Sequence, residues 1–95
     1  MFEIRQSDEF HHWLTTLRDR RAGTFVARRI DRVSAGLFGD VKFFDGIGEL
    51  RVDYGPGYRV YFVRRGATII ILLCGGDKST QSRDITRAKA LAQEY

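Results

Sequence analysis

The amino-acid sequence predicts an α+β domain with a twisted, mainly antiparallel sheet, an N-terminal helical hairpin on one face and a short C-terminal helix. Two helical periodicities in the first forty residues predict the hairpin of helices. Alternation of apolar and polar residues between positions 49 and 62 predicts a β-hairpin. A continuous apolar run at 68–74 predicts a central strand that is covered on both faces.

A short strand and an amphipathic helix begin the chain. Phe2 and Ile4 alternate with charged neighbours, as in a strand with one buried face. Ser7 is the expected N-cap of the helix, because its hydroxyl can accept a hydrogen bond from the first turn and acidic residues follow it. Apolar residues then recur with helical spacing, at Phe10, Trp13, Leu14 and Leu17. We expect Trp13 to be largely buried.

A second, longer helix is predicted from an N-cap at Asp19 to Gly36 and Gly39, since glycine commonly ends helices. Its apolar stripe is expected to face the core and consists of Ala22, Phe25, Val26, Ile30, Val33 and Leu37. Its outer face is rich in arginine, which indicates either a solvated surface or one that grips an RNA backbone. These arginines are Arg20, Arg21, Arg28, Arg29 and Arg32.

The second half of the chain is predicted to complete a sheet of four or five strands. A short strand at 41–44 leads through the turn signal Asp45-Gly46 into the hairpin. The two strands of this hairpin flank Gly55-Pro56-Gly57. After the apolar run, Ser79 or Thr80 is expected to cap a last helix. All helices are expected to pack on one face of the sheet.

The composition fits a single domain over residues 1–95, with 43% hydrophobic residues and a net charge of +4. All but three of its 16 basic residues are arginines, which suit phosphates better than lysines do. This charge favours a nucleic acid or an acidic protein as the partner, although solubility alone also explains it. No secretory signal and no apolar run of about 20 residues is evident, so we expect a cytoplasmic protein without a membrane partner.

Cysteine and histidine give no sign of a metal centre. Cys74 is the only cysteine, which excludes an internal disulfide and a cysteine-rich metal site. His11 and His12 are adjacent on a predicted helix and therefore point to different faces. We expect neither a metal nor a cofactor.

One face of the predicted β-hairpin carries an unusual set of charges. Because strand side chains alternate, Glu49 and Arg51 share one face, and Arg59 and Tyr61 share the equivalent face of the next strand. This face looks suited to an anionic ligand with a carboxylate beside it. The simpler alternative is a cross-strand charge pair on a solvated surface. The other two tyrosines of the hairpin, Tyr54 and Tyr58, are expected to pack in the core.

The order of elements and two segments resemble the RelE/ParE toxin superfamily, and within it the HigB-like addiction module killer proteins. The first segment is the hairpin Glu49-Leu50-Arg51…Gly57-Tyr58-Arg59-Val60-Tyr61-Phe62, and the second is the tail Leu73-Cys74-Gly75-Gly76-Asp77-Lys78-Ser79-Thr80-Gln81. The resemblance covers essentially the whole chain. It implies a RelE-like domain and the toxin of a type II toxin–antitoxin pair.

This resemblance implies an activity and partners. The expected toxin is a ribosome-dependent mRNA endonuclease that inhibits translation. It is expected to form a hetero-oligomer with a cognate antitoxin, of the helix-turn-helix type, that neutralises it. A ParE-like toxin that binds and inhibits DNA gyrase without catalysis has the same fold and is the alternative. A basic RNA-binding module without toxicity is a third possibility.

The resemblance also implies roles for single residues. Glu49 matches the catalytic position on the first hairpin strand in relatives that use a carboxylate, Arg59 matches the hairpin arginine, and Lys78 matches the basic residue after the last strand. Arg51 and Tyr61 are the expected substrate-binding residues. The aromatic residue that many relatives use to stack on a base has no evident counterpart. Asp84 falls near that position, and Tyr95 lies too far along the chain.

RNA can be cut without a metal because its own 2′-hydroxyl can attack the adjacent phosphate. The reaction needs a base for the 2′-proton, cations for the phosphorane charge and an acid for the leaving 5′-oxygen. Glu49 is the candidate base, unless burial restricts it to orienting the hydroxyl. Arg59 is the candidate phosphate ligand through bidentate hydrogen bonds, and Arg51 or Lys78 can share that role. Lys78 can act as the acid only if burial or cationic neighbours weaken its hold on its proton.

Overall fold

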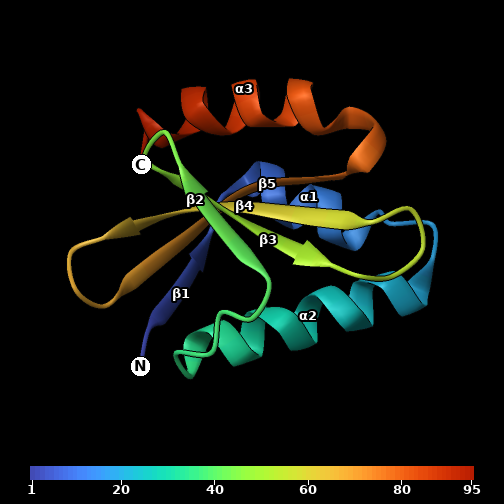
Figure 1. Cartoon of the computed structure of the whole chain (residues 1–95), viewed down its shortest axis with the longest axis horizontal. Coiled ribbons are helices and arrows are strands. Elements are labelled where there is room, and N and C mark those ends of the chain that lie inside the picture. The colour runs from blue at the N-terminus through green and yellow to red at the C-terminus, as the bar shows by residue number, and fades with distance from the viewer.

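The chain forms one five-stranded sheet with helices against both of its faces, and a computed structural model describes all of residues 1–95 (Figure 1). The elements in chain order are β1 (Glu3–Gln6), α1 (Asp8–Thr15), α2 (Arg20–Ser34), β2 (Val41–Phe44), β3 (Ile47–Val52), β4 (Tyr58–Arg65), β5 (Ile69–Asp77), the 3₁₀ turn η1 (Lys78–Thr80) and α3 (Gln81–Ala92). The predicted α+β class and order of elements are confirmed.

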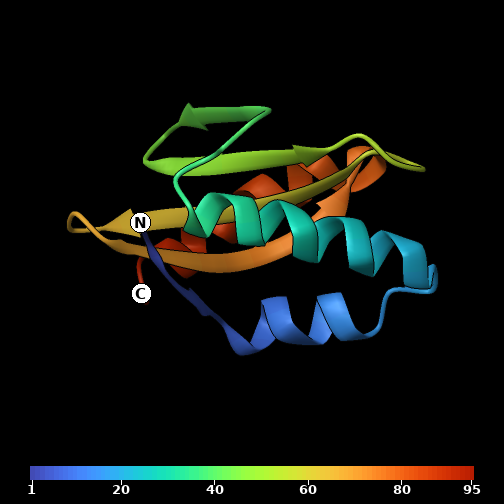
Figure 2. The same ribbon diagram turned by 90° about the horizontal axis from the view of Figure 1, so that it is seen from below.

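The sheet is mainly antiparallel, as predicted, with one parallel pair. Its strand order is β1-β5-β4-β3-β2. Strands β2 to β5 pair antiparallel in sequence, whereas β1 lies parallel to β5 at one edge. The first strand of the chain is therefore held only by the last strand, and the strands twist visibly across the sheet (Figure 2).

Helices cover both faces of the sheet, which differs from the expected one-face arrangement. Helices α1 and α2 pack against one face, and α3 packs against the other (Figure 1). The reason lies in β4 and β5, where consecutive residues such as Val60 and Tyr61 are both fully buried. A strand that is apolar on both faces needs cover on both faces. The predicted helical hairpin on one face is confirmed, and α3 supplies the second layer.

Helix α1 begins where the sequence predicts. The Ser7 hydroxyl accepts a hydrogen bond from the Phe10 amide at 3.0 Å and donates one to the Leu73 carbonyl at 2.6 Å, so one side chain caps the helix and ties it to β5. Phe10 is fully buried. Trp13 is only half-buried, and it packs over Gly75 near the end of β5.

Helix α2 departs from its predicted apolar stripe at two residues. Phe25 is 38% exposed and stacks on Tyr54, and Leu37 is 60% exposed because the helix has already ended at Ser34. Arg29 was expected on the solvated face. Its guanidinium instead turns inward and donates to the backbone carbonyls of Phe38, Asp40 and Arg51. This arginine thus fastens the helix to the strand that carries the candidate site.

The turns of the hairpins follow from their glycines. Asp45 and Gly46 both adopt positive φ angles, of 52° and 81°, as a two-residue turn between antiparallel strands requires. The loop between β3 and β4 spans 53–57, and Gly57 there has a φ of 80°. None of the helices is both long enough and apolar enough to cross a bilayer.

Candidate functional site

Three segments meet on the α3 face of the sheet and bring the predicted site residues together. Strand β3 supplies Glu49 and Arg51, β4 supplies Arg59, and the segment after β5 supplies Lys78. In the β3–β4 register, Arg51 lies directly opposite Arg59. Alternation along β3 places Glu49 on the same face as Arg51. The alternation pattern therefore correctly predicted that Glu49, Arg51 and Arg59 share one face of the sheet.

Glu49 is the buried anion at the centre of the cluster. Its residue exposure is 0%, although it is a glutamate in a sheet. Its carboxylate accepts a hydrogen bond from Gln81 Nε2 at 3.0 Å and one from Arg51 Nε at 3.2 Å. Arg59 Nε lies 3.8 Å from the same carboxylate. A buried charge is tolerated only with such partners, so this carboxylate is held on three sides.

The protonation state of Glu49 follows from these contacts. Burial by itself raises the pKa of the carboxyl, but the hydrogen bond from Gln81, the neighbouring Tyr61 hydroxyl, the hydrogen bond from Arg51 and the charge of Arg59 outweigh it. The pKa of Glu49 therefore lies below its ordinary value, and the residue is an anion at neutral pH. A strongly held, fully enclosed anion is a poor proton acceptor for a substrate hydroxyl.

The two arginines form a like-charged pair that Glu49 holds together. Guanidinium groups directly opposite on neighbouring strands repel each other. The carboxylate of Glu49 compensates for this repulsion because it contacts both. The Arg51 side chain remains 38% exposed and the Arg59 side chain 13% exposed. Arg59 donates from Nη1 to the Gly57 carbonyl at 2.9 Å, while its buried Nε makes no hydrogen bond of good geometry. N–H groups of both guanidiniums therefore remain free to donate hydrogen bonds to a ligand.

Lys78 lies beside the same hairpin loop. It is exposed and begins the 3₁₀ turn η1, which the Asp77 side chain caps through the Ser79 amide at 2.8 Å. A Cβ atom placed on Gly57 would lie 3.4 Å from Arg59 Nη1 and 3.8 Å from Lys78 Cβ. Lys78 and Arg59 therefore flank the same glycine, and both add positive charge at that corner of the sheet.

Tyr61 was expected to contact the substrate, and the structure places it in the core. It is fully buried beneath α3, and its hydroxyl lies near Glu49 without a hydrogen bond of good geometry. Burial and then the negative charge of Glu49 raise the pKa of this phenol. In this position Tyr61 can act only through Glu49 and does not offer its ring to a base.

Gln81 is the site residue that the sequence reasoning did not single out. It is the first residue of α3 and reaches back to Glu49 across 32 positions of sequence. No local pattern marks such a contact, because it depends on where α3 lies over the sheet. The sequence predicts Ser79 or Thr80 as the cap of the last helix, whereas the Asp77 side chain caps η1 and Thr80, at the N-cap position of α3, makes no side-chain cap.

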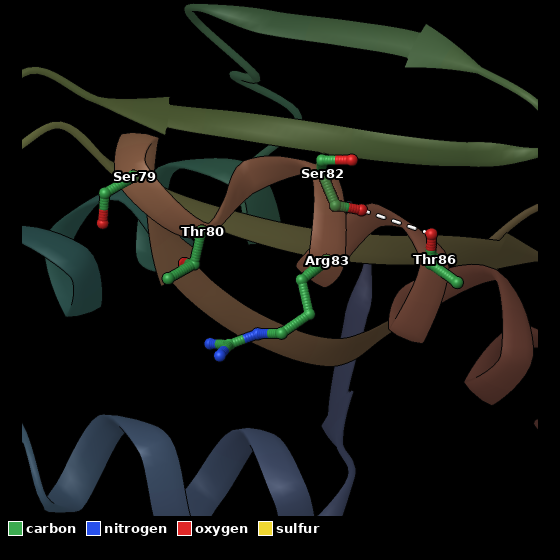
Figure 3. A pocket seen from close by; sticks show the side chains of 5 residues that line it. All are labelled: Ser79, Thr80, Ser82, Arg83 and Thr86. Carbon is green, nitrogen blue, oxygen red and sulfur yellow. Dashed lines mark hydrogen bonds between the residues drawn. The ribbon is translucent and has the colours of Figure 1, made fainter.

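A polar hollow lies next to Lys78 along the start of α3 (Figure 3). Hydroxyl groups and one guanidinium line it, and Arg83 extends from the helix into it. The Thr86 hydroxyl donates to the Ser82 carbonyl at 3.3 Å. The lining residues are Ser79, Thr80, Ser82, Arg83 and Thr86. This surface can offer hydrogen bonds to sugar and phosphate groups but no aromatic ring.

The positions considered for a missing aromatic residue serve the fold. Asp84 is 7% exposed and accepts a hydrogen bond from the Thr80 hydroxyl. A Cβ atom on Gly76 would lie 1.8 Å from Asp84 Oδ2, so this glycine lets α3 approach β5. Tyr95 lies beyond the opposite end of α3 from Gln81, where its backbone carbonyl accepts a hydrogen bond from Arg65.

Comparison with known proteins agrees with a small toxin-type domain. Residues 12–94 match the family described as phage-derived Gp49-like proteins. An uncharacterized protein of Haemophilus influenzae is 50% identical over 93 residues, which is 97% of this chain and 94% of that protein. The chain therefore belongs to the phage-derived Gp49-like family, a toxin–antitoxin-associated family.

Proposed function

We propose that this chain is the toxin of a toxin–antitoxin pair and that it cleaves mRNA on the ribosome. The observation that carries the proposal is the pair of opposed arginines, Arg51 and Arg59, held by one buried carboxylate and flanked by Lys78. Such a cluster can bind a phosphate and stabilise the extra negative charge of a phosphorane. The HigB-like assignment made from the sequence is part of this proposal.

Each residue has a defined part in the proposed reaction. Arg59 binds the scissile phosphate, because Glu49 and the Gly57 carbonyl fix its guanidinium and its Nη2 group makes no hydrogen bond within the protein. Arg51 and Lys78 share the phosphate charge from the two sides. Glu49 is a positioning residue that orients both arginines, since it is fully buried. The buried Tyr61 hydroxyl lies near Glu49 and helps to keep the pKa of its carboxyl low.

The cluster contains no group that is well suited to move protons at neutral pH. The 2′-hydroxyl of the message is the nucleophile, and its oxygen forms a bond to phosphorus as the bond to the 5′-oxygen breaks, while water takes the 2′-proton and supplies a proton to the leaving 5′-oxygen. The protein contributes charge stabilisation, and the ribosome contributes the alignment of the two oxygens, which lowers the barrier substantially. Without the ribosome, the protein is therefore expected to cleave free RNA slowly.

Single-turnover cleavage of a ribosome-bound message tests the proposal. Arg59→Ala is expected to slow cleavage on the order of a hundredfold or more, since a preorganised donor to the transition state is lost. Lys78→Ala is expected to cost less, because that side chain is exposed. Arg64→Ala, an exposed arginine on the same strand, is the matched control and should leave the rate unchanged. A folded Arg59→Ala variant that cuts at the wild-type rate would remove the proposed site.

The gyrase alternative gives a different result in the same preparation. A ParE-like toxin leaves ribosome-bound messages intact and inhibits DNA supercoiling by gyrase. Measuring both activities with the wild-type protein therefore separates the two functions. Intact messages together with inhibited supercoiling would replace the endonuclease proposal.

The proposed antitoxin is a small helix-turn-helix protein encoded next to this chain. The positive cluster of Arg51, Arg59 and Lys78 attracts an acidic segment and speeds association. Coexpression should yield a complex whose association slows as salt is raised. Failure of the adjacent small protein to copurify would contradict the partner assignment.

A further inference from the structure

A second candidate site lies on the opposite side of the hairpin loop, where two aromatic rings stack in the open. The ring centroids of Phe25 and Tyr54 are 4.6 Å apart, and their planes differ by 30°. Phe25 is 38% exposed, so more than a third of a large apolar residue meets water. Phe25 lies outside the buried core, since the buried residues of α2 are Ala22, Val26 and Val33.

The stacked rings of Phe25 and Tyr54, here called the aromatic platform, are held in place through Tyr54. The Tyr54 hydroxyl donates a hydrogen bond to Asp19 Oδ2 at 2.8 Å. Asp19 is also the N-cap of α2 and accepts a hydrogen bond from the Arg21 amide at 2.9 Å. The same carboxylate therefore fixes the start of the helix and the tyrosine ring on which Phe25 rests. A fixed ring loses little conformational freedom when a ligand stacks on it.

Positive charge surrounds this platform. Arg21, Thr24 and Arg28 join the two rings in lining a hollow of about 280 Å³. The Arg28 guanidinium carbon lies 6.0 Å from the centre of the Phe25 ring. Six arginines and two aspartates occur between residues 18 and 32, so this segment alone carries a net charge equal to the +4 of the whole chain. The net positive charge of the protein thus lies in the segment that carries Phe25, and Arg21 and Arg28 are the arginines of this segment that line the hollow.

We propose that this hollow binds a base of single-stranded RNA, stacked on Phe25, with Arg21 and Arg28 on the adjacent phosphates. Aromatic rings within a basic groove are the usual means of holding unpaired nucleotides. The bases of a duplex are already stacked on each other, which favours a single strand. An acidic peptide would use the arginines but has no need of an exposed flat ring.

The placement also connects the hollow with the cleavage site. Tyr54 belongs to the loop 53–57, and the other end of this loop, Gly57, adjoins Arg59 and Lys78. An RNA strand that crosses this loop therefore meets the cation cluster on the α3 side and the aromatic platform on the α2 side. The inference rests on the proposed function in that both sites take RNA.

Binding of short RNA tests the platform without any cleavage. The probe is a labelled 2′-O-methyl octamer, which lacks the attacking hydroxyl and cannot be cut, and the readout is fluorescence anisotropy. Phe25→Ala should weaken binding on the order of tenfold or more, as loss of a stacking ring does. Phe25→Tyr should restore it. Phe43→Ala is the matched control, because Phe43 is a 61% exposed phenylalanine on β2, and should bind as the wild type does.

An abasic octamer, which keeps the phosphates but has no bases, separates the contribution of base stacking from that of the phosphate charges. On that probe the wild type and Phe25→Ala should bind equally, since only the phosphates remain. Phe25→Ala that binds the normal octamer with wild-type affinity would overturn the inference. If the variant keeps its RNA affinity but no longer copurifies with the antitoxin, the hollow is a protein-docking surface, and the inference is again overturned. Loss of cleavage in Arg59→Ala is a separate result, so either proposal can fail while the other stands.

Discussion

Replacing Glu49 with glutamine should destabilise the protein strongly, although the two side chains have nearly the same shape. Glutamine removes the only negative charge that contacts both opposed arginines. Removing one partner of a fully buried ion pair typically costs about 3–5 kcal/mol. Since Arg51 remains 38% exposed and water can solvate it, we expect a cost at or just below the lower end of this range, about 2–3 kcal/mol. For a domain of this size the melting temperature should fall by roughly 10–20 °C.

The loss should depend on pH in a definite direction. The folded-state pKa of Glu49 lies below its ordinary value of 4.5, so its charge stabilises the native state fully above that pH. As the pH falls through the folded-state pKa, the native carboxyl takes up a proton and the stabilisation is lost. The difference in unfolding free energy between wild type and Glu49→Gln should therefore be largest at neutral pH and shrink in acid.

Thermal and urea unfolding, followed by circular dichroism from pH 7 to pH 3, measures both effects. Glu3→Gln is the control, because Glu3 pairs with Arg5 at the same two-residue spacing on β1 and its side chain is 56% exposed. An exposed pair contributes at most about 1 kcal/mol. If Glu49→Gln is as stable as Glu3→Gln at pH 7, or if its deficit is the same at pH 3, the carboxylate does not hold the arginines as described.

Two further perturbations probe the packing beneath the site. Gly76→Ala should destabilise the protein by about 1–3 kcal/mol or more, because the new methyl group meets the Asp84 carboxylate. Gly23→Ala is the control, because Gly23 has open space around it in α2. In the same urea titration this control should be neutral or stabilising. Equal stability of the two variants would contradict the close approach of α3 to β5. Burial raises the pKa of the Cys74 thiol to about 12, so iodoacetamide at pH 8 should modify it only after unfolding, as mass spectrometry can show. Rapid labelling of the native protein would mean that α3 leaves the sheet readily.

The sequence predicts most of the fold because its periodic patterns are local. Alternation places Glu49, Arg51 and Arg59 on one face, and the structure shows them in contact. Alternation does not reveal which face a later helix covers. The cover by α3 makes Glu49 a buried anion, which the sequence left open, and removes Tyr61 from solvent, contrary to its expected contact with a substrate.

Long-range contacts account for the remaining differences. Gln81 reaches Glu49 only because Gly76 lets α3 lie close to the sheet. Phe25 fits the helical spacing of a core residue, but the loop after β3 brings Tyr54 beneath it near the edge of the sheet. In both cases the environment of a side chain is set by segments that are distant in sequence, which a spacing pattern cannot report.

The parallel pairing of β1 with β5 has a consequence for the timing of synthesis. Strand β1 is complete at residue 6, yet its only partner starts at residue 69, and Gln81 joins the site later still. A chain that emerges from its N-terminus cannot close this sheet until β5 has been made. Until α3 has been made, Glu49 and its two arginines therefore lack the hydrogen bond from Gln81 and the helix that covers them.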